Sequence, residues 1–163
     1  MALVALYPGS FDPFTNGHYG ISKRALKVVD KLVIGIARNA RKKPFFTIEE
    51  RIEMIRTAMD NDPRVKVCSF EGLTVNYAAS LGASVIIRGL RAVADFEYEL
   101  QMANMNLKLN PKVETLFMMT SEEYFFVSSQ NVKEVASLEG DISDLVPPSV
   151  KERVLAKIKS RSQ

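Results

Sequence analysis

Short apolar runs alternate with helical segments along this chain. Five runs are rich in Val, Ile and Leu and lack regular alternation with polar residues: Ala2–Tyr7, Lys31–Ala37, Val65–Phe70, Ser84–Ile87 and Val113–Met118. Strands that are buried on both faces have this pattern, as in a parallel sheet that helices cover on both sides. We therefore predict five buried parallel strands.

Helices are predicted between and after these strands from apolar stripes and from start and stop signals: His18–Val29, Thr47–Met59, Thr74–Leu81, Ala92–Leu109, Ser129–Leu138 and Pro148–Lys159. The second opens with Thr47-Ile-Glu-Glu50, which has the form of a capping box. The third stops at Gly82, a residue suited to the position that follows a helix.

The order of these elements predicts a doubly wound α/β fold in a single domain, residues 1–163, with a five-stranded parallel sheet. Residues 1–140 are expected to form the sheet core and residues 141–163 a C-terminal helical segment. Ligands bind such sheets beyond the carboxyl ends of the strands, where the strand order reverses. We expect strands one and four to lie side by side at the centre, so the loops at 8–17 and 88–91 form the candidate site.

The long helix predicted at Ala92–Leu109 carries two apolar stripes. They lie about 160° apart around the helix axis, and they consist of Val93, Phe96, Leu100, Ala103 and Leu107, and of Tyr98, Met102, Met105 and Leu109. A helix that covers a sheet needs only one apolar stripe. The second stripe must therefore contact either the C-terminal helix or another subunit.

Composition and charge exclude several classes of protein. The chain is 47% hydrophobic and 25% charged, which is ordinary for a globular protein, and no apolar run approaches the roughly 18 residues that span a bilayer. Its one cysteine, Cys68, cannot form an internal disulfide, so we expect a reduced, cytoplasmic setting. The net charge of +3 suits an anionic partner and leaves nucleotides, phosphorylated metabolites and nucleic acid open.

The loop that follows the first strand carries candidate chemistry. A turn with Gly, Pro and Asn enters a helix, whose N-terminal N–H groups and dipole favour an anion. His18, the single histidine, lies in the first turn, where the dipole favours a neutral imidazole that can donate a hydrogen bond. The alternative is a structural histidine that bonds its own loop. The loop matches neither the dinucleotide-binding nor the P-loop glycine pattern.

Three stretches carry a resemblance to a known family. Thr15-Asn-Gly-His18 resembles the [HT]-x-G-H signature of the nucleotidyltransferase superfamily, and two further stretches, Tyr7–Pro13 and Ile87–Glu99, resemble the phosphopantetheine adenylyltransferases. The resemblance implies a Rossmann-like nucleotidyltransferase fold. It also implies reversible transfer of the adenylyl group of ATP, with Mg²⁺, to 4′-phosphopantetheine, giving dephospho-CoA and pyrophosphate in coenzyme A biosynthesis. A homohexamer, and CoA as an inhibitor, belong to the same expectation.

The resemblance also assigns roles to residues. It implies catalytic roles for His18, Lys42 and Arg91, and contacts to phosphopantetheine from Ser10, Lys42, Thr74 and Arg88. It implies contacts to ATP from Ser10, Phe11, His18, Gly89, Leu90, Arg91, Glu99, Tyr124, Phe125, Phe126, Val127, Ser128, Ser129 and Gln130. The chain departs from the family at Tyr124, where Trp is common, and at Gln130, where a small hydroxyl is usual. No side chain is assigned to a metal, because ATP phosphates and water can hold Mg²⁺.

Simpler interpretations stand beside several of these roles. Lys42 could be a solvated loop residue. Arg88 and Arg91 could form surface ion pairs with Asp95 or Glu99. Thr74, Ser128 and Ser129 could serve only as helix caps. For the whole chain, the alternatives are an adenylyltransferase for nicotinamide mononucleotide, a nucleic-acid-binding module, and a nucleotide sensor without turnover. Against the nucleic-acid-binding module, the sequence has neither a basic stripe interleaved with aromatic residues nor an RNA-binding or zinc-finger motif.

Overall fold

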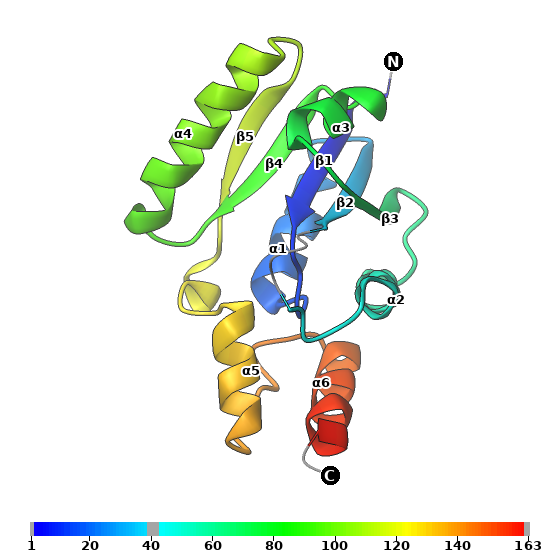
Figure 1. Ribbon diagram of the computed structural model, residues 1–163, viewed down its shortest axis with the longest axis vertical. Helices are drawn as coiled ribbons and strands as arrows, with labels where there is room; N and C mark the ends of the chain where they lie inside the picture. Colours follow the sequence, from blue (N-terminus) through cyan, green and yellow to red (C-terminus); the bar gives the residue numbers. More distant parts are fainter. Residues whose placement is uncertain (1, 39–42, 162–163) are drawn as a thin grey trace.

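The computed structural model (Figure 1) describes residues 2–38 and 43–161 and contains a five-stranded parallel sheet in the order β3-β2-β1-β4-β5. Its strands are β1 Val4–Gly9, β2 Lys31–Ala37, β3 Val65–Phe70, β4 Val85–Leu90 and β5 Glu114–Met119. The predicted doubly wound parallel sheet is confirmed, and β1 and β4 are neighbours at its centre, as expected. The strand order reverses between them.

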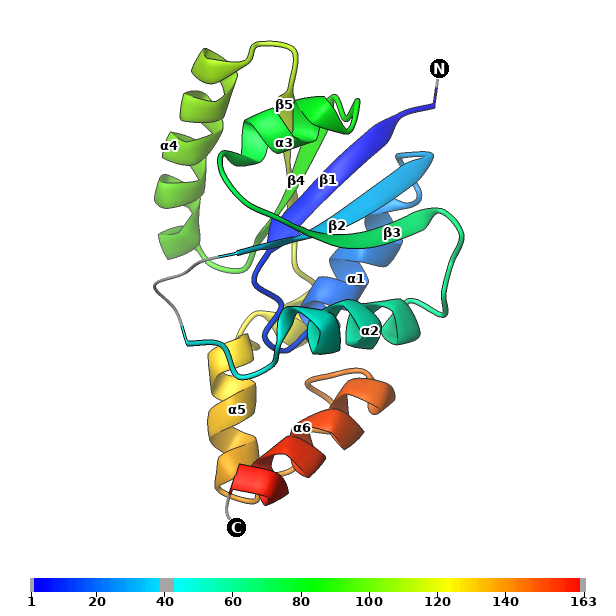
Figure 2. The ribbon, with the colours of Figure 1, turned by 45° about the vertical axis from the view of Figure 1, so that its right-hand side comes forward.

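Helices cover both faces of the sheet. They are α1 Asn16–Ala25, α2 Ile48–Ala58, α3 Thr74–Ser80, α4 Val93–Leu109, α5 Ser129–Ser137 and α6 Pro148–Arg161, with a short 3₁₀ turn at Glu122–Tyr124. Side chains of α1 and α2 pack with one face of the sheet in the larger apolar core, which α5 and α6 extend. Side chains of α3 pack with the other face in a smaller core, and α4 lies next to α3 (Figure 2).

The boundaries of several elements differ from the predicted ones. β4 continues to Leu90, three residues past the predicted end, so Arg88 lies within the strand and not after it. Pairing with β5 extends this strand, because Arg88 and Leu90 both have register partners there. α1 begins at Asn16 because Thr15 caps it, two residues before the predicted start. The capping box of Thr47 with Glu50 and the positive φ of Gly82 are as predicted.

The long helix α4 does not pack as the sequence predicts. Its first apolar stripe was expected to cover the sheet, but the side chains of Phe96, Leu100 and Leu107 are each 41% exposed. The side chain of Val93 is not among those that the structure describes. Two residues between the stripes face the sheet, Glu99, which is buried, and Asn106, which is half-buried. Of the first stripe, only Ala103, at its edge, is half-buried among the described side chains. An ion pair between Glu99 and Arg88 of β4 ties this polar seam to the sheet and leaves both apolar flanks open.

The C-terminal helix α6 packs against α2 and α5, at the end of the molecule away from α4 (Figure 1). Of the two contacts expected for the second stripe of α4, the one with the C-terminal helix is therefore wrong. The second stripe is exposed too, at Tyr98, Met102, Met105 and Leu109. Within the described part of the chain, no helix has the length and apolar character needed to cross a membrane.

Candidate active site

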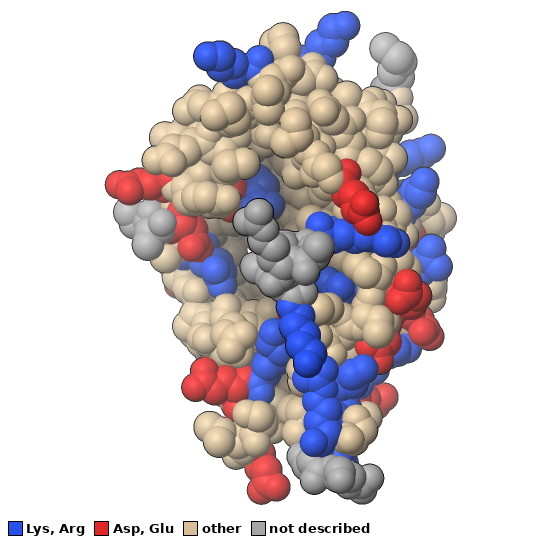
Figure 3. Space-filling model, in the orientation of Figure 1, with Lys and Arg blue, Asp and Glu red and all other residues tan. Residues whose placement is uncertain are grey.

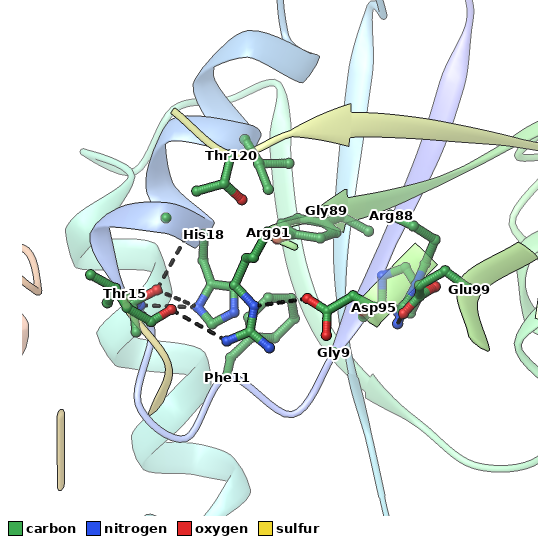
Figure 4. Close-up of a pocket in the computed structure, with 15 residues that line it drawn as sticks. Gly9, Phe11, Thr15, His18, Arg88, Gly89, Arg91, Asp95, Glu99 and Thr120 are labelled. Carbon is green, nitrogen blue, oxygen red and sulfur yellow. Dashed lines mark hydrogen bonds and ion pairs between the residues drawn. The ribbon is translucent and has the colours of Figure 1, made fainter. Parts of the chain in front are cut away.

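A cavity of about 190 Å³ opens at the carboxyl ends of β1 and β4, where the sheet order reverses (Figure 4). The loop after β1, the first turn of α1, the end of β4 and the start of α4 all contribute to its walls. Seven residues assigned by the sequence line it: Phe11, His18, Arg88, Gly89, Arg91, Glu99 and Val127. The topology therefore brings the two predicted loops together at one site.

Local capping fixes the position of His18. His18 is the third residue of α1, and Thr15 is the N-cap. The Thr15 backbone N–H donates to His18 Nδ1 at 3.0 Å, and the Thr15 hydroxyl lies 3.1 Å from the same nitrogen. In return, the His18 backbone N–H donates to Thr15 Oγ1. Because Nδ1 accepts a hydrogen bond from a backbone N–H, the proton of a neutral ring is carried by Nε2.

The surroundings of His18 keep its ring neutral. Burial is the largest cause that lowers its pKa, and the positive charges of Arg91 and Arg88 lower it further, to about 4. Aromatic rings enclose it: the Phe14 ring stacks on it at 5.7 Å between centroids, and the Phe11 ring meets it edge-on at 5.0 Å. The structural interpretation of His18 is confirmed, and its role as a donor to substrate stays a prediction. One nitrogen bonds its own loop, and the other remains available as a neutral donor.

Close packing of α1 against β4 forms the floor of the cavity. A Cβ atom on Gly89 would overlap Cδ1 of Ile21 in α1, so a larger residue there would force the Ile21 side chain to move. Phe11 has a positive φ of 48°, which is uncommon for a bulky residue, while its side chain is buried beneath the site. The loop is therefore held in an unusual conformation by packing.

Two arginines form the positively charged wall. Arg88 binds both carboxylate oxygens of Glu99, through Nε at 2.7 Å and Nη2 at 2.5 Å, and donates to the Pro8 carbonyl. Burial alone would lower the pKa of Arg88, but pairing with Glu99 outweighs it and raises that pKa. Arg91 pairs with Asp95 at 3.3 Å (Figure 4). The ion pairs that the sequence offered as an alternative are present, yet both arginines also line the cavity.

A second cavity of about 870 Å³ lies beside the first and is lined by Ser10, Ser129 and Gln130. Buried contacts hold the first loop there. Arg51 donates to the Ser10 carbonyl at 2.8 Å. The Asp12 carboxylate accepts hydrogen bonds from the backbone N–H groups of residues 45 and 46, at 2.7 and 2.8 Å. Lys and Arg side chains gather across the middle and lower part of this face (Figure 3).

Other assigned residues lie around these cavities. Thr74 lines a third cavity, of about 170 Å³, together with Arg88. The cap interpretation of Thr74 is wrong, because Leu73 is the N-cap of α3 and no side chain caps that helix. Ser128 caps α5, whereas the Ser129 hydroxyl donates to the Pro13 carbonyl. None of these three cavities is lined by Leu90, Tyr124, Phe125, Phe126 or Ser128. Lys42 falls outside the described residues.

Several residues that line the first cavity have no motif in the sequence that marks them. Tyr7 is the last residue of a predicted apolar strand, so the sequence suggests a core position for it. Thr120 follows the last strand and belongs to no recognisable motif. Thr15 had a detectable signal, because a threonine three residues before a side chain that can accept a hydrogen bond fits a helix cap. Asp12 and Arg51 gave no signal, since their partners lie more than 30 residues away.

The described acidic residues do not form a metal site. Over residues 2–38 and 43–161, no group of three or more His, Cys, Asp and Glu side chains is placed to hold a metal ion. The two carboxylates that line the cavity, Asp95 and Glu99, already pair with arginines. This donor set does not fit a resident magnesium ion, which favours an oxygen-rich shell.

Comparisons with known proteins identify the family. The cytidylyltransferase-like family model matches residues 6–135. A phosphopantetheine adenylyltransferase of Anaeromyxobacter dehalogenans (strain 2CP-C) is 54% identical over 158 residues, which cover 97% of this chain and 96% of the relative. The phosphopantetheine adenylyltransferase of Rhodospirillum centenum is 51% identical, over 94% of this chain and 86% of the relative.

A structural comparison agrees on the fold. The crystal structure of a protein described as a nicotinate-nucleotide adenylyltransferase from Vibrio parahaemolyticus has a TM-score of 0.75, with 15% identity, over 100% of this chain and 98% of the other. At that identity the similarity concerns the fold alone. The high identity to full-length relatives and the family match together show that this chain belongs to the phosphopantetheine adenylyltransferases, within the cytidylyltransferase-like family.

Proposed function

We propose that this chain transfers the adenylyl group of ATP to 4′-phosphopantetheine and releases dephospho-CoA and pyrophosphate. The observation that carries the proposal is a neutral His18, held with Nε2–H available, in a cavity that Arg88 and Arg91 also line. One uncharged donor and two guanidinium groups match a reaction between two phosphate groups. The names of the full-length relatives support the same reaction.

The chemistry requires positioning more than proton transfer. An oxygen of the phosphopantetheine phosphate is already ionised near pH 7, so it can attack the α-phosphorus of ATP without a base. The new P–O bond forms as the bond from the α-phosphorus to the bridging oxygen breaks, and pyrophosphate leaves with that electron pair. His18 Nε2–H would donate to an α-phosphoryl oxygen as its charge grows, and Arg91 would stabilise the same charge.

The arginine ion pairs indicate how the substrates would be received. Arg88 is held flat by both oxygens of Glu99, so its guanidinium is oriented before a phosphate arrives. Arg91 has weaker contacts, at 3.3 Å to Asp95 and to the Val127 carbonyl. We propose that Arg88, with Lys42, takes the phosphate of phosphopantetheine and that Arg91 takes the phosphates of ATP.

Magnesium belongs to the proposed reaction as part of the ATP substrate. The two carboxylates that line the first cavity, Asp95 and Glu99, pair with arginines, so we propose that Mg²⁺ enters on the phosphates of ATP, with water completing its shell. A cytoplasmic setting and inhibition by CoA belong to the same proposal, and they rest on the family.

We also propose that the chain assembles as a homohexamer. Both apolar flanks of α4 are exposed, and on the edge strand β5 the side chains of Leu116 and Met119 are exposed as well. Within the described chain, α6 packs elsewhere and leaves these flanks uncovered. Apolar surface of this extent is typical of a protein–protein interface, and methionine is common at such surfaces.

The test is pyrophosphate release in a reaction with MgATP and 4′-phosphopantetheine. We expect release only when both substrates are present, together with dephospho-CoA identified by mass. Nicotinamide mononucleotide replaces phosphopantetheine in a parallel reaction, and release there would favour the alternative adenylyltransferase. ATP binding without release in either reaction would favour a nucleotide sensor, and salt-dependent binding of arbitrary DNA would favour a nucleic-acid module.

A further inference from the structure

Tyr7 belongs to the wall of the first cavity but has no assigned role. It lies near the end of β1, two residues before Gly9, and is only 4% exposed. Its ring meets the Phe11 ring edge-on at 5.2 Å, and its centroid is 6.4 Å from that of His18. The Tyr7 oxygen lies 3.6 Å from the point where a Cβ of residue 89 would be. The side chain is therefore fixed between the histidine and the β4 floor.

The Tyr7 hydroxyl is unusual because no described residue forms a hydrogen bond with it. Tyr77 makes the contrast clear, since its hydroxyl lies 3.0 Å from Cys68 Sγ. A buried hydroxyl without a partner costs free energy, so native structures generally provide one. Among the described residues no fully buried side-chain N or O atom is left without a partner. The Tyr7 oxygen must therefore be reached from the cavity, where a ligand or water can bond it.

The charges around Tyr7 indicate what kind of ligand would bond the hydroxyl. Both Arg88 and Arg91 lie close enough to act electrostatically on it. Burial nevertheless raises the pKa of Tyr7 above its usual value, so the hydroxyl keeps its proton and can donate. A neutral donor between two guanidinium groups is suited to an anion with several acceptor oxygens.

We propose that the Tyr7 hydroxyl donates a hydrogen bond to a phosphoryl oxygen of the bound substrates, and so acts with His18 as a second neutral donor at the reacting centre. The inference rests on the proposed function for the identity of the substrates. Two phosphates could supply that oxygen: the α-phosphate of ATP and the phosphate of phosphopantetheine. Both are expected in the cavity that His18, Arg88 and Tyr7 line together.

The experiment compares Tyr7→Phe with a matched control, Tyr77→Phe. The first change removes only a hydroxyl that has no partner among the described residues, so the melting temperature should stay the same or rise. The second removes a hydroxyl with a protein partner, and Tyr77 lines none of the three cavities. We expect kcat/KM to fall about 10- to 100-fold in Tyr7→Phe, as for loss of a hydrogen bond to a charged group. Tyr77→Phe should keep the wild-type kinetics.

Binding measurements identify the source of the oxygen. A weaker Kd for ATP alone assigns the contact to the α-phosphate, and a weaker Kd for phosphopantetheine alone assigns it to that substrate. Unchanged affinities with a lower kcat place the contact in the transition state. Wild-type values of kcat, KM and both Kd in Tyr7→Phe would overturn the inference and leave the hydroxyl with water alone. Inactive wild-type protein would instead refute the proposed function, while the two binding arms would still test the Tyr7 contact.

Discussion

The two halves of the sheet bury their side chains very differently. In the first half, α2 lies on β2 and β3 and brings fully buried side chains such as Ile55 and Met54 into the large core. In the second half, α4 lies on β4 and β5 through a narrow seam, and Glu99 is the buried residue there. The upper left of Figure 3, over α4, is mostly uncharged surface. The first half is completed within one chain, whereas the second has apolar surface that one chain does not cover.

The same difference is present within the active site. His18 belongs to the first half, where capping and aromatic packing fix a neutral ring. Arg88 and Arg91 belong to the second half, where acidic side chains on α4 hold them. The donor is therefore preorganised by the core, and the positive wall is preorganised by ion pairs that substrate phosphates must share or displace.

The largest effect is expected at the fixed donor. His18→Ala should lower kcat by about 10²–10³-fold and leave the Kd for ATP little changed, because the donor acts on charge that develops in the transition state. The matched control is Glu50→Ala. Glu50 holds the third position of the other capping box, so both variants remove a side-chain acceptor for an N-cap N–H.

Steady-state kinetics and ATP binding decide this prediction. Glu50→Ala should retain turnover, since its side chain lies away from the three cavities. If His18→Ala weakens ATP binding tenfold and keeps kcat, the histidine serves substrate binding only. The claim that His18 stabilises the transition state would then be wrong.

Core substitutions compare the two halves by stability. Ile55→Ala should lower the free energy of unfolding by about 2–5 kcal/mol, because it leaves a cavity in the large core. Leu107→Ala on the open flank of α4 should change it by about 0.5 kcal/mol or less. Urea unfolding in dilute protein measures both. A cost at Leu107 as large as that at Ile55 would mean that the flank is covered within the chain.

A smaller effect is expected at the ion-paired wall. Arg88→Lys keeps the charge but loses the two-pronged contact, so KM for phosphopantetheine should rise about tenfold with little change in ATP binding. Arg64→Lys is the matched control, because Arg64 binds Asp62 in the same forked way at the surface. Wild-type kinetics in Arg88→Lys would place Arg88 outside the site.

The open flank of α4 is tested by assembly. Replacing Met102 and Met105 together with Glu should convert a large species into smaller ones, since charge opposes burial at an apolar contact. Light scattering gives the mass, and Leu138→Glu, at a still more exposed apolar position at the end of α5, is the control. Wild-type protein that runs as an 18.2 kDa monomer at micromolar concentration would contradict the proposed hexamer.

Local signals in the sequence predicted much of this fold. The runs at Lys31–Ala37 and Val65–Phe70 give β2 and β3 with the predicted bounds, because both are short apolar runs between turns. The capping box at Thr47 was also readable, since its partners lie three residues apart. The packing face of α4 was not, because the apolar stripes suggested an apolar face, whereas the buried residue is Glu99, paired with Arg88.

The site was predicted in part for the same reason. Sequence motifs located the two loops, and topology brought them together as expected. The tautomer of His18 depends on a hydrogen bond from the backbone N–H of Thr15. The Tyr7 hydroxyl has no hydrogen-bond partner among the described residues, and this too is a property of the folded chain. Contacts of this kind exist only after folding, so residue patterns do not reveal them.

The titration of His18 tests the central claim most directly, because it is the single histidine and its imidazole NMR signals are unambiguous. We predict a pKa of about 4, far below the 6.5 of an unperturbed histidine, with the proton on Nε2 at neutral pH. The unfolded chain then binds this proton first, so stability should fall as the pH drops from about 6.5 to about 4. A pKa near 6.5, or a proton on Nδ1, would contradict a neutral donor held at the reacting phosphate.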